Sequence, residues 1–548
     1  MQPPLLPGFD KPVVANGERE RLALDDPNAE LVLGLVYAVG TDYKPVLEYL
    51  TDQIQLGGYA ANPLRITDWF GEAAEQLGLA LNLPESPEYE RISLRIDAGN
   101  QMRSRIRQAD MFALYAASKI FSGRESDDRG DPIAHKRMVH ILASLKRPEE
   151  IETLRKIYGP GFFVISIFAD ESQRAEFLTN RKGLTEEQAA KLIERDQKEK
   201  ELEYGQRTRD TFQMADVFVA LANHQYEKGL TRFLRLIFGD PFATPTRDEH
   251  AMFLAYAASL RSGDLSRQVG AALACADGDV ISLGCNDVPA PGGGLYCSDD
   301  GDADKRDHKR REDSNEVRKR QIIDNILLAL KDRFFPGMSD EELLTNGRPL
   351  LMDTPLADVT EFGRAVHAEM DALMAAGRIG VSFRDATLYT TTFPCHTCTR
   401  HIIAAGVKRV VYIEPYPKSL ATELHDDAIT ITNNRSKDDP RIPFQPFLGI
   451  GPRRFFDLFS LRLSSGRTLE RKTDGAMALW DYRSDANPRV PMPSTSYLER
   501  EQLIHKTLRS LFFNKEELPH DTPTARGEER RRILGVSSED GETSRKLA

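Results

Sequence analysis

The chain has 548 residues, a formal net charge of −11, and 40% hydrophobic and 29% charged residues. This length predicts two or more domains, and the composition is that of an ordinary globular protein. No run of about 18 apolar residues occurs, which excludes a membrane-spanning helix. Five cysteines in so long a chain exclude a disulfide framework, so we expect a cytoplasmic protein whose reduced thiols are free to bind metal.

The first half alternates short apolar runs with helical stretches. "LVLGLVYAVGTDY", "GFFVISIFADE" and "ADVFVALAN" are typical of buried strands, and a charged helical stretch separates the last two. Strands alternating with helices predict an α/β domain with a parallel sheet. We assign this domain to residues 26–237, after an N-terminal tail (1–25) and before a linker (238–250) that contains prolines and turn-forming residues.

The second half, residues 251–515, is predicted to be a second α/β domain with α/β/α layers. After a helical stretch, two apolar runs joined by Asp277-Gly278-Asp279 predict a β-hairpin. A polar insertion covers about 291–320 and leads into a helix. The polar tail, 516–548, is predicted to be disordered. The remaining predicted elements are helices at 316–333, 365–377 and 395–405 and strands at 386–392 and 409–413.

The insertion ends in the highly charged stretch "KRDHKRREDSNEVRKR", Lys305 to Arg320. Two interpretations remain open. The stretch is either a solvated loop that enters a helix, or a loop that contacts phosphate beside a functional site, because arginine and lysine both suit phosphate oxygens.

Two cysteines lie three residues apart at the start of a predicted helix. Cys395 and Cys398 therefore point to one side, and the positive end of the helix dipole favours their thiolates. His367, also at the start of a predicted helix, adds a nitrogen, and this set of ligands suits Zn²⁺. A structural zinc site needs a fourth protein ligand, and no second Cys-x-x-Cys pair is present. We therefore predict one catalytic zinc per chain, with an open position for water.

Glu369 follows the histidine by two residues and is the predicted catalytic residue. A carboxylate beside such a zinc can take the proton of an activated water and pass it on. This chemistry suits the hydrolytic removal of ammonia from a carbon such as C4 of cytosine. The His-x-Glu and Pro-Cys-x-x-Cys pattern, completed here by Pro394, is the signature of zinc deaminases.

Residues 247–415 resemble the deoxycytidylate deaminase branch of the cytidine deaminase superfamily, through "SRQVGAAL", "GDVISLGCNDVP", "HAEMDAL" and "ATLYTTTFPCHTCTRHIIAAGVKRVVY". The resemblance implies that Asn286 contacts the nucleoside; the alternative is an asparagine that holds a tight turn. The insertion departs from the family pattern at the phosphate end of the pocket. Some members carry a second, structural zinc, to which Cys297 and His308 could contribute.

The N-terminal stretch "GLVYAVGTDYKP" resembles a phosphate-binding P-loop. Gly34, Gly40 and Thr41 are the candidate nucleotide-binding residues, but the lysine that should follow Gly40 is missing. The resemblance implies a degenerate P-loop domain like that of nucleoside and nucleotide kinases. We expect it to bind or sense a nucleotide rather than transfer a phosphoryl group.

This pairing of domains resembles the bacterial anti-phage dCTP deaminases. The resemblance implies conversion of deoxycytidine nucleotides (dCTP, and also dCMP or dCDP) to deoxyuridine nucleotides, depletion of dCTP in antiviral defence, control by a small regulatory RNA, and a homo-oligomer. The alternatives are a housekeeping dCMP deaminase, a nucleic-acid cytosine or adenine deaminase, and a nucleotide sensor. The acidic net charge disfavours a nucleic-acid substrate.

Overall fold

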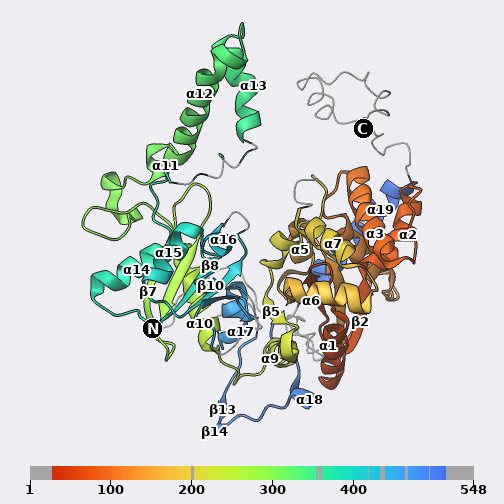
Figure 1. Ribbon diagram of the computed structural model, residues 1–548. Helices are drawn as coiled ribbons and strands as arrows, with labels where there is room; N and C mark the ends of the chain where they lie inside the picture. The colour runs from red at the N-terminus through yellow and green to blue at the C-terminus, as the bar shows by residue number, and fades with distance from the viewer. Residues whose placement is uncertain are drawn as a thin grey trace, which may run out of the picture.

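The computed structural model describes residues 28–198, 203–352, 354, 356, 359, 361–416, 419–431, 438–462, 467–490, 492 and 494–513. Figure 1 shows two halves, and each contains a six-stranded sheet. Both halves are α/β, which confirms the predicted fold class. The predicted tails, 1–25 and 516–548, lie outside the described residues. Of the helices described, none has the length and apolar character needed to cross a bilayer.

The N-terminal sheet has the strand order β12-β5-β4-β1-β3-β2. Strands β1 to β5 pair in parallel, as predicted, and β12 pairs antiparallel with β5. Alternate residues of β1 enter two cores, with Val32 and Val36 in one and Leu33 and Leu35 in the other, so both faces of the sheet are covered. The strands are β1 (Leu31–Tyr37), β2 (Ala60–Arg65), β3 (Met138–Leu145), β4 (Phe162–Phe168), β5 (Val217–Ala220) and β12 (Gly449–Ile450).

Helices of the N-terminal half connect these strands. A six-residue loop, residues 38–43, connects the end of β1 to the start of α1. Because it follows β1, this loop lies at the carboxyl edge of the parallel sheet. The helices are α1 (Lys44–Leu56), α2 (Phe70–Gln76), α3 (Glu88–Ile106), α4 (Met111–Ser122), α5 (Pro148–Tyr158), α6 (Glu171–Glu176), α7 (Glu186–Lys198), α8 (Thr208–Phe212) and α9 (Gln225–Ile237).

The C-terminal sheet has the order β10-β11-β9-β8-β6-β7. The predicted hairpin is present, and Gly278 at its turn has φ +95°, which a residue with a side chain rarely adopts. The predicted helix–strand–helix–strand order follows it. The elements are α10 (Arg247–Ser259), β6 (Gly270–Ala274), β7 (Val280–Cys285), α14 (Ala368–Ile379), β8 (Thr387–Thr392), α15 (His396–Ala404), β9 (Arg409–Glu414), α16 (Ala421–Leu424), β10 (Ile429–Thr430) and β11 (Ile442–Pro446).

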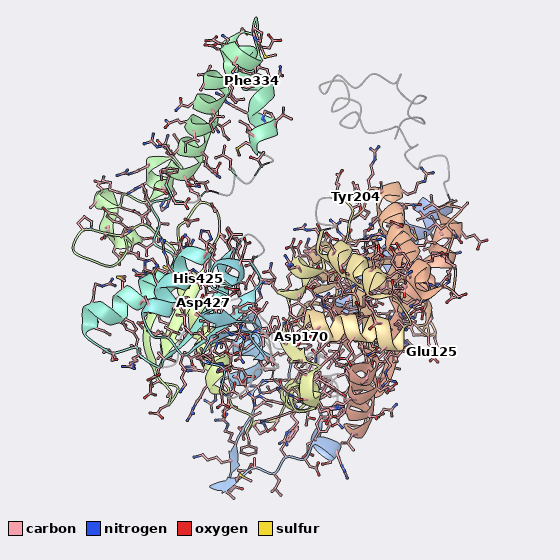
Figure 2. All side chains as sticks on the ribbon, viewed as in Figure 1. Glu125, Asp170, Tyr204, Phe334, His425 and Asp427 are labelled. Carbon is pink, nitrogen blue, oxygen red and sulfur yellow. The ribbon has the colours of Figure 1, made fainter. Side chains whose placement is uncertain are left out.

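The insertion is longer than predicted and forms a helical arm. It contains α11 (Asp307–Arg310), α12 (Ser314–Phe334) and α13 (Asp340–Met352), and α13 is an element that the sequence analysis missed. Helices α12 and α13 pack together through Ile323, Leu327 and Leu343. The arm projects from the C-terminal half, with Phe334 near its outer end (Figures 1 and 2).

The C-terminal extension, assigned from the sequence to the second domain at 251–515, pairs with the sheets of both halves. Strand β11 pairs with β9 of the C-terminal sheet, and β12, only a few residues later, pairs with β5 of the N-terminal sheet. Helix α19 (Ser494–Phe513) packs on α4, where His505 hydrogen-bonds Ser118 at 2.9 Å. Strand β12 and helix α19 therefore add to the N-terminal half, whereas Phe455, between them in the sequence, stacks on Phe253 of α10 with ring centroids 4.0 Å apart. The other short elements there are α17 (Phe455–Phe459), β13 (Lys472–Thr473), β14 (Ala476–Met477) and α18 (Tyr482–Asp485).

Glu249 of α10 binds groups from both halves. Its carboxylate accepts hydrogen bonds from Arg232 Nη2 of α9 at 2.6 Å, from Ile450 N of β12 at 2.9 Å and from Thr246 N at 2.7 Å. The side chain of Glu249 is 1% exposed.

Because removal of one partner of a buried ion pair leaves the other uncompensated, we expect Glu249→Ala to lower the free energy of unfolding by about 3 kcal/mol, measured by calorimetry.

A matched control for Glu249 is Glu227→Ala on α9. Glu227 is 47% exposed and faces His224 at 3.4 Å, so its surface pair should contribute less than about 0.5 kcal/mol. Equal effects of the two substitutions would contradict the role of Glu249 in joining the halves.

Candidate active site

Three predicted metal ligands meet at the starts of two helices. Cys395 is the N-cap residue of α15, Cys398 lies in its first turn, and His367 is the N-cap residue of α14. His367 Nδ1 lies 3.3 Å from Cys395 Sγ and 3.4 Å from Cys398 Sγ. The parallel pair β8 and β9 supports this arrangement, because β8 ends a few residues before Cys395.

The spacing of these atoms fits zinc. A tetrahedral zinc with bonds of about 2.3 Å to sulfur and about 2.1 Å to nitrogen holds a sulfur and a nitrogen about 3.6 Å apart. The three ligand atoms lie within 4.8 Å of one another. His367, Cys395 and Cys398 would hold the ion, and as three protein ligands they leave one tetrahedral position open.

The electrostatics at the start of α15 favour a metal-binding thiolate. Hydrogen bonds from Cys398 and His367 lower the pKa of Cys395 to about 4, despite burial. The hydrogen bond with Cys395 is the main cause that raises the pKa of His367 to about 9. The pKa of Cys398 is raised, first by its hydrogen bond with Cys395 and then by burial. Cys395 is thus ionised at neutral pH, and the thiolate is the form that binds metal.

Glu369 lies in the first turn of α14 and is 4% exposed. Burial raises the pKa of its carboxyl group, while the positive charge of His367 opposes that shift. Glu369 lines the same cavity as His367 and Cys395. A buried carboxylate beside a zinc site is positioned to transfer protons.

The cavity over these residues has a volume of about 430 Å³, within the range of small-molecule sites. Asn286 lines it, as predicted, but its side chain also binds the backbone: Oδ1 accepts from Val269 N at 2.6 Å and Nδ2 donates to Arg267 O at 2.8 Å. Asn286 therefore shapes the wall of the cavity, including the segment that carries Arg267.

Three basic residues line this cavity: Arg267, Lys319 and Arg364. Lys319 belongs to the charged stretch for which contact with phosphate was one of the two predicted roles, whereas Arg267 and Arg364 were not predicted. Arg364 binds Asp307 at 2.7 Å, and Lys319 of α12 binds Glu316. The charged stretch from Lys305 to Arg320 thus contributes to the cavity wall, and its high charge was the available signal.

The other predicted metal ligands do not come together. Among the residues that the structure describes, Cys297 and His308 share no group of metal ligands, and His308 Nδ1 faces Gly263 O at 3.3 Å. A second group, Glu30 with His135 and His140, is already neutralised, because the guanidinium of Arg124 lies 2.8 Å from Glu30.

The P-loop-like residues are divided between a strand and a loop. Gly40, with φ +84°, and Thr41 lie in the loop between β1 and α1, as predicted. Gly34 instead lies inside β1, where a Cβ atom would be 2.5 Å from Leu145 Cδ1. Close packing against Leu145 and Phe162 is a sufficient reason for a glycine at position 34, and its predicted contact with phosphate stays a prediction.

Residues 245–414 match the family model described as "Cytidine and deoxycytidylate deaminase zinc-binding region". The deoxycytidylate deaminase of Enterobacteria phage T4 is 43% identical over 54 residues, which are 10% of this chain and 28% of that protein. ComE operon protein 2 of Bacillus subtilis is 41% identical over 66 residues, which are 12% of this chain and 35% of that protein. The chain thus spans only about a third of the length of these curated relatives.

Solved structures align with parts of the chain at low similarity. The dCMP deaminase from the cyanophage S-TIM5, in complex with dCMP and dUMP, is 18% identical, with a TM-score of 0.22, over 37% of this chain and 98% of that one. A gluconokinase from Sinorhizobium meliloti is 15% identical, with a TM-score of 0.22, over 38% of this chain and 93% of that one. TM-scores this low do not establish a common fold. The family match and the geometry of His367, Cys395 and Cys398 together show that the chain carries a zinc-binding domain of the cytidine and deoxycytidylate deaminase type.

Proposed function

We propose that the chain catalyses the zinc-dependent hydrolytic deamination of deoxycytidine nucleotides, dCTP in particular, to deoxyuridine nucleotides and ammonia. The observation that carries this proposal is the buried carboxylate of Glu369 in the cavity of a three-ligand zinc group. A purely structural zinc site, or a nucleotide sensor, needs neither an open metal position nor a proton carrier.

The residues of the cavity divide the chemistry between them. Zinc, when bound, supplies a Lewis acid that lowers the pKa of water towards neutrality. The carboxylate of Glu369 accepts the proton of the attacking water and returns it to N3 of the cytosine ring. It then assists proton transfer to the amino group, so that the C4–N bond breaks and ammonia leaves. Burial of Glu369 raises the pKa of its carboxyl group, and a buried carboxylate in the cavity is positioned to accept and return a proton.

Three cations of the cavity wall are available to bind a phosphate group of the substrate. Arg267, Lys319 and Arg364 line the cavity together with His367 and Cys395, and also with the acids Asp264, Asp307, Asp313 and Glu316. Arg364 and Lys319 are held in place by carboxylates, and a phosphate would compete with those acids for the cations. The choice of dCTP over dCMP or dCDP rests on the likeness of the chain to anti-phage dCTP deaminases.

A substrate series tests the proposal. Purified protein is incubated with deoxycytidine, dCMP, dCDP, dCTP and a cytosine-containing single-stranded oligonucleotide, and the products are separated by chromatography. We expect dCTP to give the highest kcat/KM. Preference for dCMP would favour a housekeeping enzyme, deamination of the oligonucleotide would favour a nucleic-acid deaminase, and binding without ammonia release would favour a sensor.

The biological role is part of the same proposal. We propose that the chain depletes dCTP during phage infection, as a homo-oligomer, under the control of a small RNA; these properties are implied by the resemblance of the sequence. Nucleotide pools in infected cells should show a fall in dCTP with the native protein and none with Glu369→Gln. Co-expression of the small RNA should prevent the fall, and light scattering should give a mass above the 61.6 kDa of one chain.

A further inference from the structure

A second large cavity, of about 440 Å³, lies in the N-terminal half. Its lining contains seven lysine and arginine side chains and three carboxylates, so its wall is strongly cationic although the whole chain is acidic. It is bounded on one side by the loop that follows β1, including Gly40 and Thr41. Focused positive charge in a concave site favours an anionic ligand.

The cations of this wall are held in place by neighbouring acids. Glu88 binds Arg91 at 2.7 Å and Lys182 at 3.0 Å, and Glu85 binds Arg95 at 2.6 Å. Glu88, Arg91 and Arg95 belong to α3, Glu85 lies just before it and Lys182 follows residue 181, and all five line the same cavity as the loop. Planar arginine groups fixed in this way are suited to bind phosphate oxygens.

The loop side offers an unused hydroxyl group. Thr41 is 5% exposed, lines the cavity, and its Oγ1 has no hydrogen-bond partner among the residues that the structure describes. A buried polar atom without a partner costs about 1–3 kcal/mol. A ligand that accepts a hydrogen bond from Thr41 would remove that cost.

Aromatic side chains form another part of the cavity wall. Phe70 and Phe112 line it and stack on each other with ring centroids 4.9 Å apart, and Tyr37 and Tyr43 stack at 4.4 Å. Aromatic surfaces beside a cationic wall match the two parts of a nucleoside phosphate, because bases stack on aromatic rings while phosphates bind cations.

The loop at this cavity is connected to the interface between the halves. Val39 N donates to Asp196 Oδ2 at 3.0 Å, and Val39 O accepts from Arg174 Nη1 at 3.3 Å. Asp196 and Arg174 also line a smaller cavity of about 160 Å³, together with Tyr412 and Ile413 of β9. A ligand that moves the loop would therefore move groups that face β9.

The last residue of β9, directly after Ile413, contacts residues of the deaminase cavity. Glu414, the last residue of β9, accepts hydrogen bonds from Arg267 at 3.3 Å and from Thr392 Oγ1 at 3.2 Å. Arg267 and Thr392 both line the cavity of Glu369. Strand β9 thus borders both the small cavity beside the loop after β1 and, through Glu414, the residues of the proposed active site.

From these observations we infer that the N-terminal cavity is a regulatory site for a nucleoside phosphate, whose occupancy changes the rate of deamination. The ligand is bound and not consumed, because the lysine of a working P-loop is absent from the loop. The effect on rate rests on the proposed deaminase activity, whereas binding does not.

Binding is tested by calorimetry on the full chain carrying Glu369→Gln, with ATP, dATP and dTTP as probes that lack cytosine. We expect one site per chain for at least one probe. Lys182→Glu should weaken binding by about tenfold or more, the value of a lost charged hydrogen bond, and the near-isosteric Thr41→Val by about threefold. The matched control is Lys191→Glu, at an exposed lysine outside the cavity, which should bind as the parent does.

The effect on rate is tested with dCTP as the substrate. The probe that binds should change kcat/KM for dCTP in the native chain and in Lys191→Glu, and this change should be lost in Lys182→Glu. Absence of binding by every probe, binding that survives both Lys182→Glu and Thr41→Val, or binding without a change in rate would each overturn the inference. If no cytosine compound releases ammonia, the proposed function fails while the binding result still stands.

Discussion

Glu369→Gln is expected to abolish deamination while zinc remains bound. Glutamine keeps the size of the side chain but cannot accept the proton of the attacking water. Proton transfer by one positioned group is typically worth about 10²–10⁴ in rate, and the same carboxylate is proposed to act twice, so we expect a loss at or above about 10⁴. Single-turnover assays with dCTP, beside zinc analysis of the same samples, measure both properties.

The matched control for this prediction is Asp371→Asn. Asp371 is also a buried carboxylate of α14, but its Oδ2 accepts a hydrogen bond from Cys285 N at 3.2 Å and it does not line the cavity. Asparagine can accept the same bond, so most of the activity should remain. A Glu369→Gln protein that retained more than about a tenth of the native rate would defeat the mechanism. Loss of zinc from it would make Glu369 part of the coordination.

Cys395→Ser and His367→Ala are each expected to lose most of the zinc, of which the native chain should contain about one ion. Each substitution leaves only two protein ligands, and a tetrahedral site with two ligands holds zinc weakly. Deamination should disappear in proportion to the zinc. Because bound metal stabilises the folded state, the thermal midpoint should also fall. Elemental analysis and calorimetry on dialysed protein provide the measurements.

Cys275→Ser is the control for the zinc substitutions. Cys275 precedes the turn of the β6–β7 hairpin and belongs to no group of metal ligands among the described residues, so its loss should leave both zinc and activity intact. Full zinc in Cys395→Ser and in His367→Ala would show that the ligand assignment is wrong. Two ions per native chain would point to a further zinc site.

Local patterns predicted the elements that carry the chemistry. His367, Glu369, Cys395 and Cys398 lie on the starts of the two helices that their spacing indicated, and the distances between the ligand atoms fit zinc. A Cys-x-x-Cys at a helix start is local information: helix geometry alone brings the two sulfur atoms to one side. The parallel sheet of the N-terminal half was predicted for a similar reason, because buried strands alternate with helices.

The features that the sequence did not predict depend on contacts between distant parts of the chain. Strand β12 has two residues, too few for any periodic signal, yet its pairing with β5 unites the halves. Gly34 matched a loop motif by its type, but Leu145 and the strands around it decided that it lies inside a sheet.

The sequence by itself determined the kind of chemistry, and the tertiary structure decided what surrounds it. The zinc ligands and the proton carrier are recognisable in the sequence because two short spacings hold them. His367 and Glu369 lie at the start of α14, and Cys395 and Cys398 lie at the start of α15. The cationic wall of Arg91, Arg95 and Lys182, and the position of Lys319 beside the zinc ligands, depend on which faces of separate helices meet. That choice is made by the packing of apolar faces over the whole chain, and no local spacing records it.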